Sequence, residues 1–546
     1  MAFILQRRAL RKLVQHQLEQ IPNAKDQGLL SESTTGNNST TDIESFPPTI
    51  EDFSQDPYLS IPGIMYKVDP HGKGYLEVGW TDKDDSFNPK CWSLAHRLRS
   101  TLLICLVALT GTIASSIDSV ISDRAAADFG VSSTVESLAT AFFLGGFGAG
   151  ALLASPLSEL VGRFPVYLVS LAIFAGWTVG SALSPNIAAQ IVFRFLMGLT
   201  ASPVLTVAGG SISDMWSPLE RTFAYPVYAV PGFGGAVLGP VIGTWVGRRP
   251  NMSWRWVEWT VLILIGLSFA SLSLLMSETF PPRILKIKAK AFRKLTDDAR
   301  FKTSTEASDS SSVRSILKRN FMRPFFLCFE PIVISFTVYL SIAYTILFTF
   351  LDGYHEIFAN VYDIDENLSN TSFVGILAGI LLSSPLIPWA YHWTVKQLRR
   401  DGDDGSGSKL HRESRLIFAM IGAPFLPIGL FWMGWTDFAW ISIWSPLAAS
   451  ALIGFSIICI FMSANLYIID SYEMYAASAL TFNSLARYIS ASGFTVIGIP
   501  LYGNLGTHYT LTILGIISTL AVPIPYVLYK WGPILRARST WASHGR

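Results

Sequence analysis

The sequence predicts an all-α membrane protein of twelve transmembrane helices in two six-helix bundles. Of the 546 residues, 50% are hydrophobic and only 15% are charged, whereas a soluble domain carries roughly 25% charge. Apolar runs recur at the length that crosses a bilayer in a helix, about 20 residues. A long basic stretch separates the first six runs from the last six.

The twelve apolar runs set the expected helices. They are 100–122, 137–157, 164–182, 188–211, 223–246, 256–276, 329–350, 372–392, 416–435, 438–463, 475–501 and 509–529. Several contain Gly and Pro, which membrane helices tolerate because neighbouring helices satisfy the freed backbone groups.

The runs and the stretches between them predict five regions. We expect a cytoplasmic, largely disordered N-terminal tail over 1–97, a six-helix bundle over 98–278 and a cytoplasmic basic linker over 279–327. A second six-helix bundle over 328–530 and a cytoplasmic tail over 531–546 complete the chain. Two such bundles place a substrate path at their interface.

The loops give the orientation. Lys and Arg gather before the first run, in the linker, between the eighth and ninth runs and in the C-terminal tail, while the loop 351–371 has acidic residues and neither Lys nor Arg. Basic loops stay in the cytoplasm, so both termini are expected there. The acidic loop also holds two glycosylation sequons, at Asn367 and Asn370.

The first hundred residues contain a segment with helical spacing and a polar segment. Residues 3–21 place apolar side chains at helical spacing among basic ones. This pattern predicts either a helix lying on anionic lipid or an ordinary helix that is solvated or bound to a partner. Residues 22–60 are rich in Ser, Thr, Asn, Asp and Pro, and are predicted to be disordered.

Composition excludes several classes of function. The formal net charge of +2 argues against a nucleic-acid partner, and the four cysteines are too dispersed for a metal site or a disulfide framework. The phosphate-binding Gly-Lys-Ser/Thr loop and the common hydrolase motifs are absent from the sequence. We therefore expect no enzyme, cofactor or metal, and transport that is passive or driven by a gradient.

Charged residues within the apolar runs are the first functional candidates. Arg194 lies in the fourth run and Arg487 in the eleventh. A charge inside a bilayer costs at least a few kcal/mol and marks a functional site by default, although pairing with backbone carbonyls is an alternative for Arg194. Asp118 and Glu258 lie near ends of their runs, where water is within reach, and are further candidates for proton coupling or substrate binding.

A second candidate lies at the turn between the second and third runs. Glu159 and Arg163 are spaced i, i+4 around Gly162, and Asp214 ends the fourth run on the same side. This acid–base–acid set predicts a latch that holds one conformation. A solvated loop with ordinary charges is the alternative.

The fifth run carries a glycine stripe. Gly235, Gly239 and Gly243 recur every four residues and therefore share one helix face. Such a face lets another helix approach closely, and Pro240 can kink the helix. General small-residue packing explains part of this pattern.

Taken in order, these motifs resemble the major facilitator superfamily, and within it the fungal drug:proton antiporters with twelve helices. The resemblance rests on Asn88–Ser93, Ser155–Val166, the Arg194-Phe195…Gly198 set and Gly235–Gly243. Trp254, Glu330, Tyr475 and the ending from Gly532 also look similar.

The chain departs from the family pattern at several positions. The helix 2–3 motif has Ser155, Glu159 and Phe164 where relatives have Gly, Asp and a basic residue, and Thr244 replaces the last glycine of the helix 5 motif. Asp118 stands where relatives often have an uncharged residue.

The resemblance implies a proton-coupled efflux pump that works by alternating access. Its substrates would be small amphiphilic organic compounds: drugs, polyamines or a fungal secondary metabolite or toxin. Arg194 would tune a proton site or bind substrate, and the helix 5 glycines would seal the bundle interface. We expect a monomer in the plasma membrane, with the vacuolar membrane as an alternative. An uptake permease or facilitator for a nutrient and a non-transporting receptor remain rival functions.

Overall fold

The structure is a computed structural model. It describes residues 1–20, 56–69, 74–82, 84–249, 252–308, 321–400, 412–539 and 541–542. The stretch predicted to be disordered, 22–60, lies outside the described residues except for its last five. Parts of the basic linker and of the helix 8–9 loop, 309–320 and 401–411, also lie outside them.

The first bundle is built from six apolar crossings. Its elements are α2 (Leu94–Ser116), η4 (Ile117–Ile121), α3 (Ser122–Phe129), α4 (Ser133–Val161), α5 (Arg163–Ala182), α6 (Ile187–Ala201), α7 (Pro203–Met215), α8 (Arg221–Gly247) and α9 (Trp256–Leu275), preceded by the short turn η3 (Pro89–Cys91). The first crossing ends in the tight turn η4, and the fourth is divided into α6 and α7 at Pro203, because proline cannot supply a backbone N–H and favours the start of a helix.

The second bundle repeats this plan with more interruptions. Its elements are α13 (Pro331–Tyr354), the π-helix η5 (His355–Asn360), α14 (Glu366–Thr371), α15 (Val374–Leu382), α16 (Leu386–Arg400), η6 (Arg412–Leu416), α17 (Ile417–Gly422), α18 (Phe425–Trp435), α19 (Trp444–Tyr472), η7 (Glu473–Tyr475), α20 (Ala476–Ala521) and α21 (Pro523–Arg538).

The longest helix contains a reversal. α20 has 46 residues and is broken at Gly506, whose φ of 73° and ψ of 170° are not helical. A straight helix would hold Leu501 and Thr510 about 13 Å apart, yet the Thr510 hydroxyl donates to the Leu501 carbonyl at 3.2 Å. The chain therefore folds back at Gly506, a position that only glycine adopts easily.

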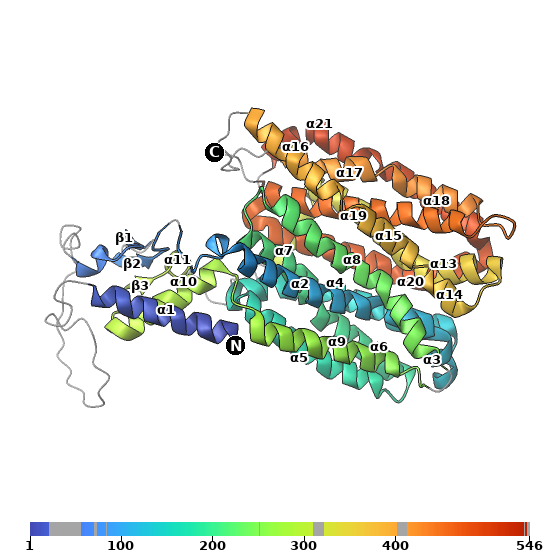
Figure 1. Cartoon of the computed structure of the whole chain (residues 1–546), viewed down its shortest axis with the longest axis horizontal. Coiled ribbons are helices and arrows are strands. Elements are labelled where there is room, and N and C mark those ends of the chain that lie inside the picture. Colours follow the sequence, from blue (N-terminus) through green and yellow to red (C-terminus); the bar gives the residue numbers. More distant parts are fainter. Residues whose placement is uncertain are drawn as a thin grey trace.

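The described residues contain eleven helical segments that are long and apolar enough to cross a membrane, of which the last covers Ala476–Arg538. Because this segment reverses at Gly506 and is long enough to cross twice, the described residues provide twelve crossings. The predicted all-α membrane fold is confirmed. α1 and α10 lie at one end of the bundles, and α3 and α14 lie at the other (Figure 1).

A small domain sits beside the bundles at the α1 end (Figure 1). It comprises α1 (Ala2–Glu19), η2 (Pro57–Ser60), β1 (Ile64–Val68), β2 (Gly74–Val78), α10 (Pro281–Thr296), β3 (Phe301–Lys302) and α11 (Ser304–Ser308). The sheet order is β1-β2-β3, with β1 antiparallel to β2, and β2 parallel to β3 through the Leu76–Phe301 pair. Val14, Leu18 and Phe292 complete a core separate from that of the bundles.

This domain departs from the expected disordered tail, because described parts of 1–97 fold together with the linker. The helix predicted over 3–21 is present as α1, and its apolar face, Leu10, Val14 and Leu18, is buried within the chain. Of the two alternatives for that helix, the structure favours binding to a partner, here α10 of the same chain.

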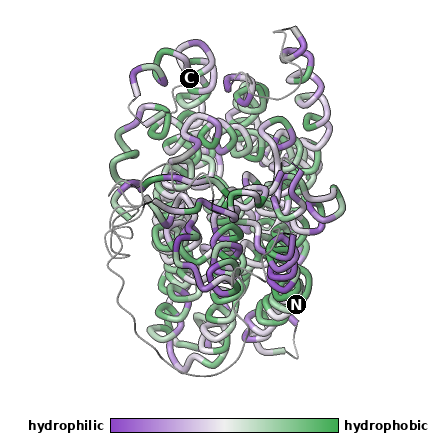
Figure 2. The backbone as a smooth tube through the Cα atoms, turned by 90° about the vertical axis from the view of Figure 1, so that its left-hand side faces the viewer, coloured by the Kyte–Doolittle hydropathy of each residue, from purple (hydrophilic) through white to green (hydrophobic). Residues whose placement is uncertain are grey.

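Hydropathy fits a membrane location. Large apolar side chains such as Leu102, Val169, Ile263 and Leu520 are exposed on the outer faces of the crossings. In Figure 2, which looks along the bundles from the α1 end, most of the helical tube is hydrophobic, and hydrophilic residues gather in the helix that starts at the N-terminus.

Candidate transport site

Three of the predicted residues meet inside the first bundle. Arg194 of α6 forms an ion pair with Asp118 of η4, and its Nε lies 3.3 Å from Glu258 Oε1 of α9. Its Nη1 also donates to the Ala114 carbonyl at 3.0 Å. All three side chains are at most 2% exposed. We call Arg194, Asp118 and Glu258 the Arg194 triad.

The burial of the two acids corrects the sequence analysis. Asp118 and Glu258 were expected near water, but they are 1% and 0% exposed. The turn η4 lies against α8 and α2 and places Asp118 inside the bundle. Sequence position near the end of an apolar run did not reveal this inward placement, which depends on the packing of three helices.

Glu258 is held by neighbours from two other crossings. Ser181 Oγ donates to Glu258 Oε1 at 2.8 Å, and Gln190 Nε2 donates to the same oxygen at 3.4 Å. Ser184 Oγ in turn donates to Gln190 Oε1 at 2.7 Å. These contacts fix one oxygen, while Glu258 Oε2 is buried with no hydrogen-bond partner among the described residues.

The triad has one cation for two carboxylates. With both acids ionised it would carry one buried negative charge in excess, and an uncompensated buried charge is strongly unfavourable. A single bound proton, or a cationic group of a ligand, removes that excess. The site therefore suits reversible proton binding.

Arg487 lies apart from the triad. It projects from α20, is 3% exposed, and its Cζ lies 4.8, 5.2 and 5.1 Å from the ring centres of Tyr344, Phe461 and Tyr488. Its Nε and Nη1 are buried with no hydrogen-bond partner among the described residues. Aromatic faces thus supply the main stabilisation of this cation.

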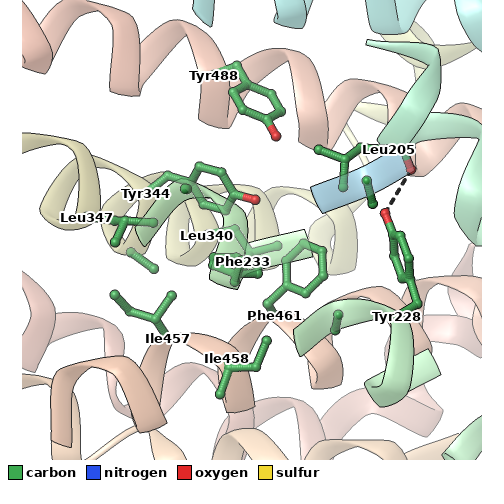
Figure 3. Packing of buried hydrophobic residues seen from close by; sticks show 14 of the residues in the cluster. Leu205, Tyr228, Phe233, Leu340, Tyr344, Leu347, Ile457, Ile458, Phe461 and Tyr488 are labelled. Atoms are coloured by element: carbon green, nitrogen blue, oxygen red, sulfur yellow. Dashed lines mark hydrogen bonds between the residues drawn. The ribbon is translucent and has the colours of Figure 1, made fainter. Parts of the chain in front are cut away.

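The three rings against Arg487 belong to the second bundle, and a ring of the first bundle packs on two of them. Phe233 of α8 lies 5.2 Å from Tyr344 of α13 and 4.6 Å from Phe461 of α19, measured between ring centres. Figure 3 shows these rings together, with Tyr488 nearby and the Tyr228 hydroxyl donating to the Leu205 carbonyl at 3.1 Å. We call Phe233, Tyr344, Phe461, Arg487 and Tyr488 the aromatic centre.

Asn483 adds an unsatisfied polar group next to this centre. It lies one helical turn before Arg487 on α20, is fully buried, and neither its amide nitrogen nor its oxygen has a partner among the described residues. Unpaired buried polar groups are rare and need an explanation. A ligand with hydrogen-bonding groups supplies one. Asn483 was not predicted, because an uncharged side chain in an apolar run does not stand out as a charge does.

The predicted gating residues also come together. Arg163 Nε lies 3.1 Å from Asp214 Oδ2, and Arg163 Nη1 donates to Ser158 Oγ at 2.6 Å. Glu159, Arg163 and Asp214 line one cavity of about 540 Å³ between the bundles. Gly162 has a φ of 105°, and a Cβ there would lie 2.5 Å from Glu278 Oε2, so the turn requires glycine.

Glu278 contacts the predicted gating residues and was not among the residues predicted from the sequence. Its Oε1 accepts from the backbone N–H groups of Arg163, Thr279 and Phe280, each at 3.0 Å, and thereby caps the start of α5. Burial raises the pKa of Glu278, against the lowering effect of these hydrogen bonds. Gln6 of α1 bonds both to the Glu278 backbone N–H, at 2.9 Å, and to its carbonyl, at 3.3 Å.

A second ionic cluster joins the two bundles. Asp470 of α19 lies 3.2 Å from Arg221 of α8 and 2.6 Å from Arg415 of η6, in each case between oxygen and nitrogen. Arg415 also donates to Thr222 and to the Pro218 carbonyl of the first bundle. We call Arg221, Arg415 and Asp470 the bundle bridge. In the sequence, Arg415 is one of the basic residues between the eighth and ninth apolar runs and does not stand out among them.

The helix 5 glycines were expected at the interface between the bundles, but they face helices of their own bundle. A Cβ on Gly235 or Gly239 would collide with Thr112 or Ser116 of α2, and one on Gly243 with the Ile117 carbonyl of η4. The close approach predicted from their spacing is confirmed, but its partner lies in the same bundle. Pro240 lies within α8 between these contacts.

The two sequons differ in exposure. Asn370 is 4% exposed, so a glycan there would require the side chain to leave its packing. Asn367 lies in the same helix, α14, and is half-buried.

Two six-crossing bundles, a cavity between them and ionic groups buried in their core define a secondary membrane transporter. The sequence profile of the Major Facilitator Superfamily matches residues 103–495. The chain belongs to this superfamily, whose members are transporters and not enzymes.

Relatives agree with this assignment. The MFS-type transporter kojT of Aspergillus flavus is 43% identical over 463 residues, which cover 85% of this chain and 82% of that protein. Transporter mfs1 of Schizosaccharomyces pombe is 30% identical over 482 residues, covering 87% and 90%. The proton:xylose symporter XylE shares the fold, with a TM-score of 0.58, 15% identity, and 83% and 98% coverage.

Proposed function

We propose that this protein exports small amphiphilic organic compounds in exchange for protons, by alternating access between its two bundles. The observation that carries the proposal is the Arg194 triad, in which one buried arginine serves two buried carboxylates. Such a set is most stable with one proton bound. Release of that proton to one side and uptake from the other would couple the proton gradient to transport.

A chain of rings links the proton site to the aromatic centre. Arg194 Cζ lies 5.6 Å from the Phe143 ring centre, Phe143 lies 6.2 Å from Phe147, and Phe147 lies 4.6 Å from Tyr488. Phe143 and Phe147 belong to α4, and Tyr488 to α20 of the other bundle. A change of charge at the triad can thus act on the bundle interface through packed side chains.

The aromatic centre supports a substrate with a flat ring. Three rings lie against Arg487, and Phe233 packs on two of them. The side-chain amide of Asn483 has no hydrogen-bond partner among the described residues. Among the expected substrates, a neutral or acidic aromatic drug or fungal metabolite fits such a centre. A polyamine fits it less well, because the fixed charge of Arg487 repels cations.

The proposed setting follows from the loops. The basic ends of the bundles belong in the cytoplasm by the positive-inside rule, which places both termini there and the loop 351–371 outside. We propose a monomer in the plasma membrane, with the vacuolar membrane as the alternative, and glycosylation at Asn367 in preference to Asn370.

Proton flux in proteoliposomes tests the proposal. Vesicles containing purified protein and an entrapped pH-sensitive dye would be given an inward-directed or outward-directed pH gradient, then a panel of amphiphilic aromatic compounds. An exporter of this kind moves protons against the compound, so each active compound dissipates the gradient when it and the protons start on opposite sides. A proton-coupled uptake permease would respond when both start on the same side.

The variant Glu258→Gln serves as the control in that assay, because it leaves Arg194 with one carboxylate and makes the triad neutral without a bound proton. It should retain exchange of labelled substrate without moving protons. Proton flux that persists in this variant would remove the triad from the coupling mechanism. A protein that binds compounds but moves neither them nor protons would instead be a receptor.

A further inference from the structure

A basic groove runs between α1 and α10, in the small domain at one end of the bundles. It encloses about 720 Å³ and is lined by Ile4, Arg7, Arg8, Arg11, Arg283, Lys286, Ile287, Lys290, Ala291, Arg293 and Lys294. Eight of these eleven residues are basic, and none is acidic. We call these lining residues the basic groove.

Few of these cations are paired with an acid among the described residues. Glu306 lies 3.2 Å from Arg293 and 3.8 Å from Lys286, and no other ion pair with a groove residue is formed within the described part of the chain. Arg283 Nε is buried with no hydrogen-bond partner among the described residues. Clustered guanidinium and ammonium groups with free donors are the chemistry that binds phosphate groups.

The groove opens at the level where a membrane helix ends. The N-terminal amine of Met1 donates to the Ser273 carbonyl, two residues before the end of α9. Met1, Ile4 and Leu5 are 67%, 54% and 54% exposed, and Leu274 of α9 is also exposed. Apolar side chains beside a basic surface at this depth are typical of a lipid interface. We call Met1, Ile4 and Leu5 the apolar tip of α1. If the ligand were a soluble phosphate compound, the exposure of this apolar tip would have no explanation.

We propose that the basic groove binds the phosphorylated headgroup of an anionic phospholipid, with the apolar tip of α1 resting among its acyl chains. The volume suits a headgroup such as phosphoinositol bisphosphate, since ligand sites commonly enclose about 300–1,000 Å³. The same helix reaches the gating turn, because Phe3 stacks on Phe164 at 4.9 Å and Gln6 bonds to Glu278. A lipid bound there therefore contacts a segment tied to the gate. This inference is independent of the transported substrate.

Binding to the full-length protein in neutral detergent tests the proposal. The probes are short-chain phosphatidylinositol bisphosphate, the chain-free inositol trisphosphate and short-chain phosphatidylcholine, measured by microscale thermophoresis. The test variant is Arg7→Gln/Arg11→Gln/Lys290→Gln. The matched control is Lys396→Gln/Arg399→Gln/Arg538→Gln, which removes the same charges from exposed positions of α16 and α21 at the same end of the bundles.

We expect the bisphosphate lipid to bind the wild type, and the test variant to weaken this binding at least about tenfold, while the control changes it by about twofold or less. The trisphosphate should bind at least about tenfold more weakly than the lipid, because it lacks the acyl chains. Since the three residues replaced in the test variant are exposed, its gel-filtration profile should match the wild type.

Three outcomes would overturn the proposal. Equal weakening by both variants would mean unspecific attraction to a basic surface. Equal affinity for the lipid and the trisphosphate would identify a soluble polyphosphate as the ligand. Equal binding of phosphatidylcholine would mean that the headgroup charge plays no part.

Discussion

The Arg194 triad and the bundle bridge are built from the same residue types, but their ratios of arginine to acid are opposite. The triad has one arginine for two acids and lies within one bundle. The bridge has two arginines for one acid, and its members come from both bundles. A rocking motion of the bundles leaves the triad intact but must break the bridge. The first arrangement therefore suits storage of a proton, and the second suits control of conformation.

The largest expected effect is that of Arg194→Ala. Without the cation, the two buried carboxylates should hold their protons and no longer release them. Proton-coupled export should therefore fall by roughly a hundredfold or more, which corresponds to a cost of about 3 kcal/mol for breaking a buried pair. Export is measured in cells and in proteoliposomes. The variant should still reach the membrane.

Arg249→Ala is the matched control, because Arg249 is an exposed arginine of the same bundle. It should export normally. Normal export by Arg194→Ala would remove the triad from the mechanism and leave it as a packing feature.

Asp470→Asn tests the other side of the comparison. It leaves Arg221 and Arg415 buried without their shared anion. This should destabilise the conformation in which the bridge holds the two bundles together. We expect transport to fall by about tenfold, given a cost of about 1–3 kcal/mol for an unsatisfied buried group. Alkylation of an Ala477→Cys probe, in a background without the four native cysteines, should become faster.

Glu473→Gln is the control for that variant. Glu473 lies three residues further on, pairs with Arg412 at 3.0 Å within the second bundle, and has a 59% exposed side chain. Exposed pairs contribute about 0–1 kcal/mol, so neither transport nor alkylation should change. A similar response from both variants would mean that the bridge has no special role.

A smaller effect is expected where the glycine stripe positions the triad. Gly243→Ala places a Cβ against Ile117, the neighbour of Asp118, and should cost about 1–3 kcal/mol through overpacking. A fluorescence-based melting temperature in detergent should fall by a few degrees. Gly266→Ala is the control, since a Cβ there meets nothing within 4 Å. Equal melting temperatures would show that the stripe tolerates bulk.

The smallest effect concerns an acid that has no arginine beside it. Asp437, in the loop between α18 and α19, is 2% exposed, and burial raises its pKa to about 7, with His508 opposing the rise. The folded chain thus holds this proton more tightly than the unfolded chain, so stability is greatest at acid pH and declines as pH rises from about 4 through 7.

Asp437→Asn should remove that decline. Melting temperatures of variant and wild type should be closest near pH 4 and separate progressively up to pH 8, with the variant higher. The opposite order at pH 8 would mean that the surroundings of Asp437 stabilise its ionised carboxylate.

Sequence reasoning found the fold because hydrophobic length and loop charge are local signals. It found Arg194 for the same reason, since a charge in an apolar run stands out. It did not find that Asp118 and Glu258 meet Arg194, because the three residues lie on separate crossings and only packing brings them together. The bundle bridge was missed because Asp470 and Arg415 lie at the ends of apolar segments, where charges are ordinary.

The small domain was missed for a different reason. β3 has only two residues, and its parallel partner β2 precedes it by the whole first bundle. No periodicity in either segment indicates such a pairing. Likewise, the apolar residues of α1 did not reveal whether lipid or α10 covers them.

The parallel pairing of β2 with β3 has a consequence for biogenesis. During synthesis the β1–β2 hairpin leaves the ribosome before six membrane helices, and its partners α10 and β3 emerge only after them. Until then Leu76 and Val78, which are buried in the finished domain, lack these partners and are exposed to solvent. The small domain can therefore close only after the whole first bundle has been synthesised and before the second bundle begins. Ribosome-stalled chains that end before residue 302 should be cleaved by protease at the hairpin more readily than chains that end after it.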